Sequence, residues 1–354
     1  MKPIHLFISF FVFLFSCNIK PNENTIPKNQ KLLKYTSQIQ MTENKDSVFI
    51  QSGSEKLGFS KSELPLKTAM VVPTSAISYL DELGLLSVIK GISQPDFVYN
   101  PEILELYNQK KIEQIGSFDE IFTEKIILSK PDIFITSSGP TLARFHQQIK
   151  NSGIKILYID EYDEKEPLAR AEYVKIFGKL FGKEKEADLI FEEIENNYNE
   201  ILKTVGESNK KKPTVFANQI YGDVWYMPGG KSFQSRLFSD AGGDYLWKND
   251  DSEGSLKLSF ESVFEKARNA DIWLNAGDYP NIKSLTGAYK NYEWFDAVKN
   301  KEVYNWNKKS NSKGANDYFE TGTVRPDLVL KDLSAVFYPD LFPGYELIFY
   351  KKLD

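Results

Sequence analysis

The chain has 354 residues, of which 41% are apolar and 14% aromatic, so it can bury the core of two ordinary domains. Its net charge of -5 disfavours nucleic acid or an anionic membrane surface as a partner. The only histidines are His5 and His146, and the only cysteine is Cys17. A site for a bare metal ion and histidine-based acid–base catalysis are therefore both disfavoured.

The first 17 residues have the pattern of an export signal. Lys2 gives a positive start, an apolar run covers residues 7–15, and small Ser16 precedes Cys17. The run is too short to span a bilayer, which takes about 20 residues. A cysteine directly after the cleavage point resembles the bacterial lipobox, whose cysteine is acylated. We therefore predict a signal peptide over 1–16 and a lipidated Cys17; an incidental cysteine and an uncleaved anchor are the alternatives.

The next segments lead into an α/β pattern. Residues 17–31 are polar and lack hydrophobic periodicity, which predicts a flexible tether. Short β-like runs in 32–60 predict an initial β-hairpin. From residue 64, short apolar strands alternate with helices, which predicts a parallel sheet covered on both faces and an N-terminal lobe over 32–165. The strands are expected at 68–72, 88–92, 132–136 and 155–159, and the helices at 76–83, capped by Thr74 or Ser75, 123–129 and 142–151.

The middle of the chain is helical, and a second α/β pattern follows it. Helices are expected at 167–181 and 183–205, within a helical segment over 166–211; the second would be roughly 35 Å long. Strands at 214–218, 271–275 and 303–306, with helices at 232–240 and near 294–298, predict a C-terminal lobe over 212–354. We therefore expect an α/β fold of two Rossmann-like lobes, joined by one long helix, with a ligand cleft between them.

The two lobes share a local pattern. In each, a hydroxyl residue able to cap a helix (Thr123 or Ser259) precedes a glutamate in the first turn (Glu124 or Glu261). An aspartate, Asp132 or Asp271, then opens an apolar strand. Taken alone, each glutamate is explained by its favourable interaction with the helix dipole.

Short motifs recur in a fixed order along these segments. They are Val72-Pro73-Thr74-Ser75, Gly116-Ser117, Lys130-Pro131-Asp132, Gly153-Ile154-Lys155-Ile156, Trp225-Tyr226-Met227-Pro228-Gly229-Gly230 and Ala241-Gly242-Gly243. In this order, and together with the lipobox, they resemble the substrate-binding lipoproteins of ABC importers for iron–siderophore complexes, haem and cobalamin. The similarity extends from about residue 64 to the C-terminus.

The resemblance implies a function and its partners. A protein of this kind captures a metal chelate and delivers it to an ABC permease and its ATPase. It would be a monomer without an intrinsic cofactor or metal, exported and lipid-anchored to the bacterial cell envelope, facing the periplasm. The ligand would be a ferric siderophore, with haem or cobalamin as alternatives. Glu124 and Glu261 would then dock on permease arginines, one from each lobe.

Ligand contacts are expected where strand ends face the cleft. Trp225 is singled out because the surrounding Gly-Asp and Pro-Gly-Gly turns suggest a loop or hairpin and not a regular buried strand. From there an indole could stack on a planar ligand; packing of the hairpin onto its own lobe is the alternative. Arg325 could grip a ligand carboxylate or pair with Asp327. The full set of candidates is Thr74, Ser75, Tyr99, Ser138, Trp225, Tyr226, Asn275, Tyr318 and Arg325.

Two other classes of function compete with a binding protein. A lipid-anchored α/β hydrolase would need a nucleophile and a base, but the chain has no Gly-x-Ser-x-Gly elbow and no suitable histidine. A lipoprotein that holds together an envelope complex without any ligand is the third hypothesis.

Overall fold

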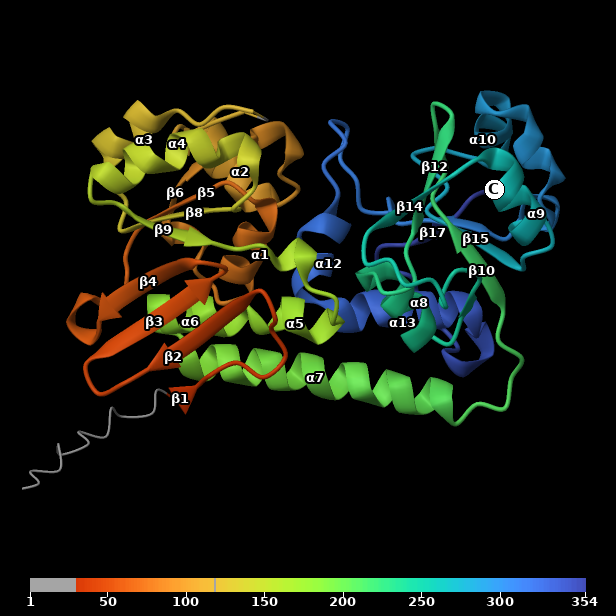
Figure 1. Ribbon diagram of the computed structural model, residues 1–354, viewed down its shortest axis with the longest axis horizontal. Coiled ribbons are helices and arrows are strands. Elements are labelled where there is room, and N and C mark those ends of the chain that lie inside the picture. Colours follow the sequence, from red (N-terminus) through yellow and green to blue (C-terminus); the bar gives the residue numbers. More distant parts are fainter. Residues whose placement is uncertain (1–29, 118) are drawn as a thin grey trace, which may run out of the picture.

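The structure is a computed structural model that describes residues 30–117 and 119–354. The predicted signal peptide, Cys17 and nearly all of the predicted tether lie outside the described residues. Two α/β lobes stand side by side above one long helix, α7 (Figure 1). In the part of the chain that the structure describes, no helix is both long and apolar enough to cross a membrane.

Residues 30–60 form a four-stranded antiparallel sheet, which has more strands than the predicted hairpin. The alternating burial of the central strands explains how this sheet packs one face inward, with Val48 and Ile50 in the core. Its strands follow each other in order: β1 (Gln30–Lys31), β2 (Ile39–Glu43), β3 (Ser47–Ser52) and β4 (Glu55–Ser60).

The N-terminal lobe holds a five-stranded parallel sheet in the order β7-β6-β5-β8-β9. Its central strands are buried on both faces, as the continuous apolar runs predicted. The strands are β5 (Ala69–Val71), β6 (Ile89–Ile92), β7 (Glu113–Gln114), β8 (Ile133–Thr136) and β9 (Lys155–Tyr158). The helices are α1 (Thr74–Glu82), α2 (Pro101–Asn108), α3 (Thr123–Ser129) and α4 (Pro140–Asn151).

The C-terminal lobe has a five-stranded sheet in the order β13-β10-β15-β16-β17, in which only β17 is antiparallel to its neighbour. Its strands are β10 (Thr214–Ala217), β13 (Asp244–Tyr245), β15 (Ile272–Leu274), β16 (Val303–Asn305) and β17 (Lys351–Lys352). A second, antiparallel sheet consists of β11 (Ile220–Tyr221), β12 (Val224–Pro228) and β14 (Ser255–Leu258). The helices are α8 (Phe233–Asp240), α9 (Phe260–Ala267), α10 (Ile282–Ala288), α11 (Asp296–Lys299), α12 (Thr321–Val324) and α13 (Pro326–Phe337).

The shared pattern of the two lobes has a structural basis in a threonine–aspartate pair. A carboxylate oxygen of Asp132 accepts from the Thr68 backbone N–H at 3.0 Å, and the Thr68 hydroxyl oxygen accepts from the Asp132 backbone N–H, also at 3.0 Å. Thr214 and Asp271 repeat this exchange at 2.8 and 2.9 Å. Each pair joins the starts of two neighbouring strands, so the aspartate that opens each strand fixes the register of the sheet.

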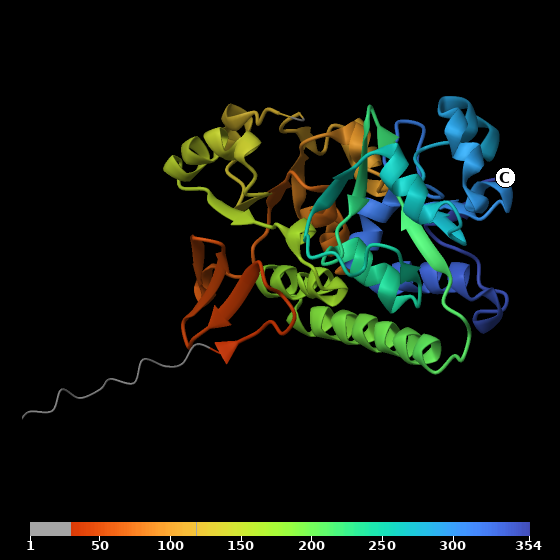
Figure 2. The same ribbon diagram turned by 45° about the vertical axis from the view of Figure 1, so that its right-hand side comes forward.

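Three consecutive helices connect the lobes: α5 (Pro167–Glu172), α6 (Val174–Phe181) and α7 (Glu184–Gly206). The apolar face of α7 is buried at Ala187, Ile194, Tyr198 and Val205, as its periodicity predicted. It packs against α6 on one side and α13 on the other. Both views show α7 running beneath the two lobes (Figures 1 and 2).

The segment between β1 and β2 is held by two buried glutamates. The Glu172 carboxylate accepts from the backbone N–H groups of Lys34, Tyr35 and Thr36 at 2.6, 2.7 and 3.2 Å. The Glu164 carboxylate accepts from the next two backbone N–H groups and from the Ser37 hydroxyl, the latter at 2.7 Å. The N-terminal sheet is thereby fixed to the helices that connect the lobes.

Candidate ligand cleft

A cavity of about 310 Å³ lies where the end of the N-terminal lobe meets the C-terminal lobe. Tyr162 and Lys165 line it from the first lobe, Arg170 from α5, and Phe233 and Tyr318 from the second lobe. In Figure 1, α5 and α12 lie between the two lobes. The volume is at the lower end of the range for small-molecule sites, and the two-lobed lining is that of a binding cleft.

Arg170 is the principal charged group of this cavity. Its Nη2 donates to the Tyr162 carbonyl at 2.8 Å, and its guanidinium carbon lies 3.4 Å from the centroid of the Phe233 ring. Its Nε is buried and has no hydrogen-bond partner among the residues that the structure describes. Burial lowers the pKa of Arg170, but an arginine remains a cation at physiological pH. The cavity therefore presents a fixed positive charge with donor capacity to spare.

A second cavity of about 420 Å³ adjoins the first, with which it shares Asn218 and Phe319. It lies at the carboxyl edge of the C-terminal sheet, where the strand order reverses between β10 and β15. Asn218 and Asn275 directly follow these strands, with φ of 62° and 58°. The carboxyl edge at such a reversal is where α/β folds bind ligands.

Three of the predicted contact residues line these cavities. Tyr318 lines the first, and Tyr226 and Asn275 line the second. Arg170 was not among the candidates, because nothing in its local sequence distinguishes a cleft arginine from one on a helix surface. The Pro167 start of a short helix at the lobe junction was the available signal.

Trp225 was wrongly interpreted as a ligand platform. Its side chain is 0% exposed, and its Nε1 donates to the Ala217 carbonyl at 2.9 Å. The indole packs against Phe216, Trp273 and Phe295, with ring centroids 6.1, 5.5 and 6.0 Å away. The residue belongs to β12, which forms a hairpin with β11, as the surrounding turn residues indicated. It also pairs with β14, where Leu258 lies opposite Trp225, and this strand makes β12 part of a buried sheet.

We expect Trp225→Ala to lower the free energy of unfolding by about 3–5 kcal/mol, because it removes a large side chain from a packed core. Denaturant unfolding measures the change, and Tyr221→Ala, at a side chain that is 79% exposed, provides the control. An alanine variant as stable as the wild type would return Trp225 to the candidate contacts.

Of the two alternatives for Arg325, the structure shows the pairing with Asp327 and not a contact in either cavity. Its Nε and Nη2 donate to Asp327 at 3.0 and 2.8 Å, and Nη2 also reaches Glu193 at 3.2 Å. The paired Asp327 carboxylate raises the pKa of Arg325 further. The guanidinium thus joins α7 to the start of α13, and it lines neither cavity.

The candidates from the first lobe lie outside both cavities. Ser75 is buried and its hydroxyl donates to Glu161 at 2.5 Å, so it is a structural residue. Ser138 is exposed, and its N–H donates to Asp160. Thr74 begins α1, but the helix has Pro73 at its N-cap and no side-chain cap, contrary to expectation. The proline-led turn after β5 replaces the predicted hydroxyl cap.

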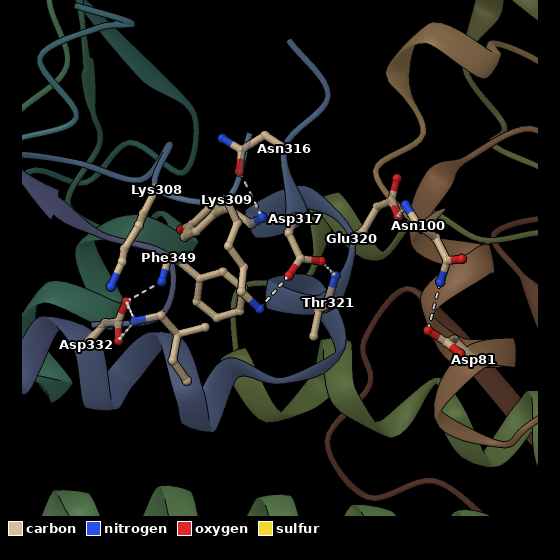
Figure 3. A network of polar contacts seen from close by, with 12 residues as sticks. Asp81, Asn100, Lys308, Lys309, Asn316, Asp317, Glu320, Thr321, Asp332 and Phe349 are labelled. Atoms are coloured by element: carbon tan, nitrogen blue, oxygen red, sulfur yellow. Dashed lines mark hydrogen bonds and ion pairs between the residues drawn. The ribbon is translucent and has the colours of Figure 1, made fainter. Parts of the chain in front are cut away.

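Tyr99, the remaining candidate, takes part in a contact between the lobes. Its backbone N–H and that of Asn100 donate to the Glu320 carboxylate at 2.5 and 3.1 Å. The Asn100 side chain bonds Asp81 in turn (Figure 3). Nearby, Lys313 pairs with Asp96, and Asn311 donates to the Val98 carbonyl at 3.4 Å. The polar segment after β16 thus bridges to the first lobe.

Glu320 makes this contact sensitive to pH. Burial, reinforced by Asp317 and Asp81, raises its pKa to about 7. Because the folded state then holds a proton that the unfolded state has already lost, the free energy of unfolding falls as pH rises from about 4.5 to about 7.

We expect Glu320→Gln to remove this component of the pH dependence. The stability of the wild type relative to the variant should fall by up to about 3 kcal/mol across that window, as measured by denaturant unfolding at several pH values. Asp96→Asn, which alters an exposed charge in the same bridge, should retain the wild-type slope. Equal slopes for the wild type and Glu320→Gln would contradict the assignment.

Glu124 and Glu261 are both exposed in the first turns of α3 and α9. Ser259 caps α9 as predicted. The prediction that Thr123 caps α3 was wrong, because Phe122 is the N-cap residue and no side chain caps that helix. In both views the two helices lie on the side of the molecule away from α7 (Figures 1 and 2).

Comparison with known proteins identifies the family. A model of the periplasmic binding protein family matches residues 92–310, more than half of the chain. An uncharacterized lipoprotein of Methanocaldococcus jannaschii is 28% identical over 336 residues, which cover 92% of this chain and 78% of that protein.

Solved structures show the same fold at lower identity. A possible iron-binding (periplasmic solute-binding) protein from Staphylococcus epidermidis has a TM-score of 0.61 at 21% identity, covering 77% of this chain and 99% of that one. A periplasmic haem-binding protein from Pseudomonas aeruginosa has a TM-score of 0.62 at 14% identity, covering 82% and 98%. The family match and the two-lobed fold together show that this chain belongs to the periplasmic binding proteins, which bind solutes and are not enzymes.

Proposed function

We propose that this protein is the substrate-binding component of an ABC importer and that it captures an anionic metal chelate, with a ferric siderophore as the first candidate and haem or cobalamin as alternatives. The main support is the cavity between the lobes, into which Arg170 brings a charge with an unpartnered donor. Iron and haem are the ligands named for two structural relatives. Aromatic side chains beside Arg170, namely Phe233, Tyr318 and Phe319, offer surfaces for a large ligand.

We expect Arg170→Gln to weaken binding of an anionic chelate roughly 10–100-fold, because a charge-assisted hydrogen bond is lost. Tryptophan fluorescence titrated with ferric siderophores, haemin and cobalamins gives the dissociation constants. Arg170→Lys keeps the charge, so its dissociation constant should lie between those of the wild type and Arg170→Gln. Arg268→Gln alters an exposed arginine after α9 and should bind as tightly as the wild type. An unchanged dissociation constant for Arg170→Gln would remove the residue from the site.

We also propose that the protein is exported and held to the cell envelope by acylation of Cys17. The lipobox-like sequence supports this, as does the relative described as a lipoprotein. Labelled fatty acid should be incorporated into the wild type and not into Cys17→Ser, which should leave the membrane fraction. Labelling of the serine variant would show that acylation occurs elsewhere.

Docking on the permease is proposed to use one acidic patch on each lobe. On α3, Glu124 is followed one turn later by Leu128, which is 82% exposed. On α9, Glu261 shares its helix with Phe260 and Phe264, against which the half-exposed Trp294 packs. Each patch thus combines a carboxylate with an exposed apolar side chain, the combination that suits a protein interface.

Replacing Glu124 and Glu261 together by Ala should leave ligand affinity unchanged but weaken docking on the reconstituted permease roughly tenfold or more. Replacement of both by Lys should be worse, because like charges then meet across the interface. Glu102 and Glu186, exposed in the first turns of α2 and α7, provide the control pair. Transport by the double Lys variant at the wild-type rate would return both residues to helix stabilisation alone.

A further inference from the structure

Buried polar atoms without partners are concentrated behind the second cavity. Both side-chain atoms of Asn275 lack a hydrogen bond within the described part of the chain, and so do Oδ1 of Asn305 and Oδ1 of Asn307. The Tyr350 hydroxyl lies close to the Asn275 amide, but no hydrogen bond of acceptable geometry joins them. Leaving such atoms unpaired is costly, so folded proteins rarely gather several in one place without a use for them.

Asn275 is the central member of this group. Its side chain is 5% exposed and lines the cavity, directly after β15. Its φ of 58° lies in the left-handed region, which asparagine tolerates better than most residues. The backbone therefore holds the carboxamide at the carboxyl edge of the sheet, with its donor nitrogen and its acceptor oxygen both without a partner among the described residues.

The other residues that line the second cavity are, like Asn275, mostly neutral and polar. Asn218, Gln219, Asn307 and Asn316 add further carboxamides. Among the described residues that line the cavity, Asp278 alone is charged, and it accepts from the Asn307 side chain. A negatively charged ligand group would meet a carboxylate here without a compensating cation, whereas Arg170 provides that cation in the adjoining cavity. The aromatic walls are formed by Tyr226, Trp306 and Phe319.

We infer that the second cavity binds an uncharged part of the ligand that carries hydrogen-bond donors and acceptors side by side, namely carboxamide or hydroxyl groups. This inference rests on the proposed function. The ligand would then be bipartite, with its anionic part at Arg170 and its neutral polar part against Asn275 and the neighbouring amides. Shared lining by Asn218 and Phe319 makes the two parts of the site continuous.

Two matched pairs of chelates test the inference and distinguish its two chemistries. Cyanocobalamin is compared with a monocarboxylate derivative in which one peripheral amide is hydrolysed, and a glucosylated ferric triscatecholate is compared with the same chelate lacking its sugars. In one pair the wild type should bind the member with intact neutral groups at least about tenfold more tightly. Preference in the first pair identifies carboxamides, and preference in the second identifies hydroxyl groups.

Asn275→Gly is the decisive variant, because glycine accepts the same backbone conformation and removes the amide. It should reduce the preference to within about twofold while the melting temperature of the unliganded protein stays the same or rises. Ser334→Ala is the matched control, since it removes another buried, unpartnered polar atom that lies outside both cavities. That control should keep the full preference.

The outcomes separate the two levels of the proposal. Binding of a chelate by the wild type without preference in either pair would overturn this inference alone, and so would a preference that survives in Asn275→Gly. A lower melting temperature with parallel loss of affinity for both members of a pair would make Asn275 structural and overturn the inference. Failure of every chelate to bind would overturn the proposed function together with the inference.

Discussion

The packing of α7 along α6 and α13 sets the geometry on which the rest of the molecule depends. Its buried face runs beneath both lobes, and Arg325 ties the start of α13 to α7 through Glu193 and Asp327. A continuous helix resists bending far more than an extended linker, so we expect the lobes to move relative to each other by small hinge rotations only. The first cavity is built from side chains of both lobes, so its shape depends on the spacing that this helix sets.

The two adjoining cavities differ in the kind of polar group that they remove from water. In the first, Arg170 keeps its charge although burial lowers its pKa, and it stacks on Phe233, which limits its freedom before any ligand arrives. In the second, amides replace charges, and unpaired polar atoms reduce the stability of the unliganded protein. A site of this kind gains selectivity because a ligand lacking the matching groups leaves the buried atoms unpaired.

The sequence predicted the architecture well because its signals are local. The apolar runs of β5, β8 and β10 and the periodicity of α7 depend on residues close together in the chain. The burial of Trp225 was missed because its hairpin also pairs with β14, a strand distant in the sequence that places Leu258 opposite Trp225. Arg170 and Arg325 could not be told apart locally, because each lies in or beside a helix that begins with proline. Their roles are decided by partners distant in the sequence, such as Phe233 and Glu193.

The glutamates that bind residues 34–38 determine which contacts would carry a mechanical force applied at the N-terminal end of the chain. Glu172 lies on α5 and Glu164 just before it, and Lys34 also pairs with Glu195 on α7. Tension applied ahead of β1 would load the β1–β2 ladder first and these carboxylates next. Glu164 and Glu172 lie in or beside the connecting helices and not at the far end of either lobe. A force transmitted through them therefore has a short lever arm about the junction of the lobes. A pull on the N-terminal end of the chain would therefore turn the molecule as a whole and leave the relative orientation of the two lobes unchanged.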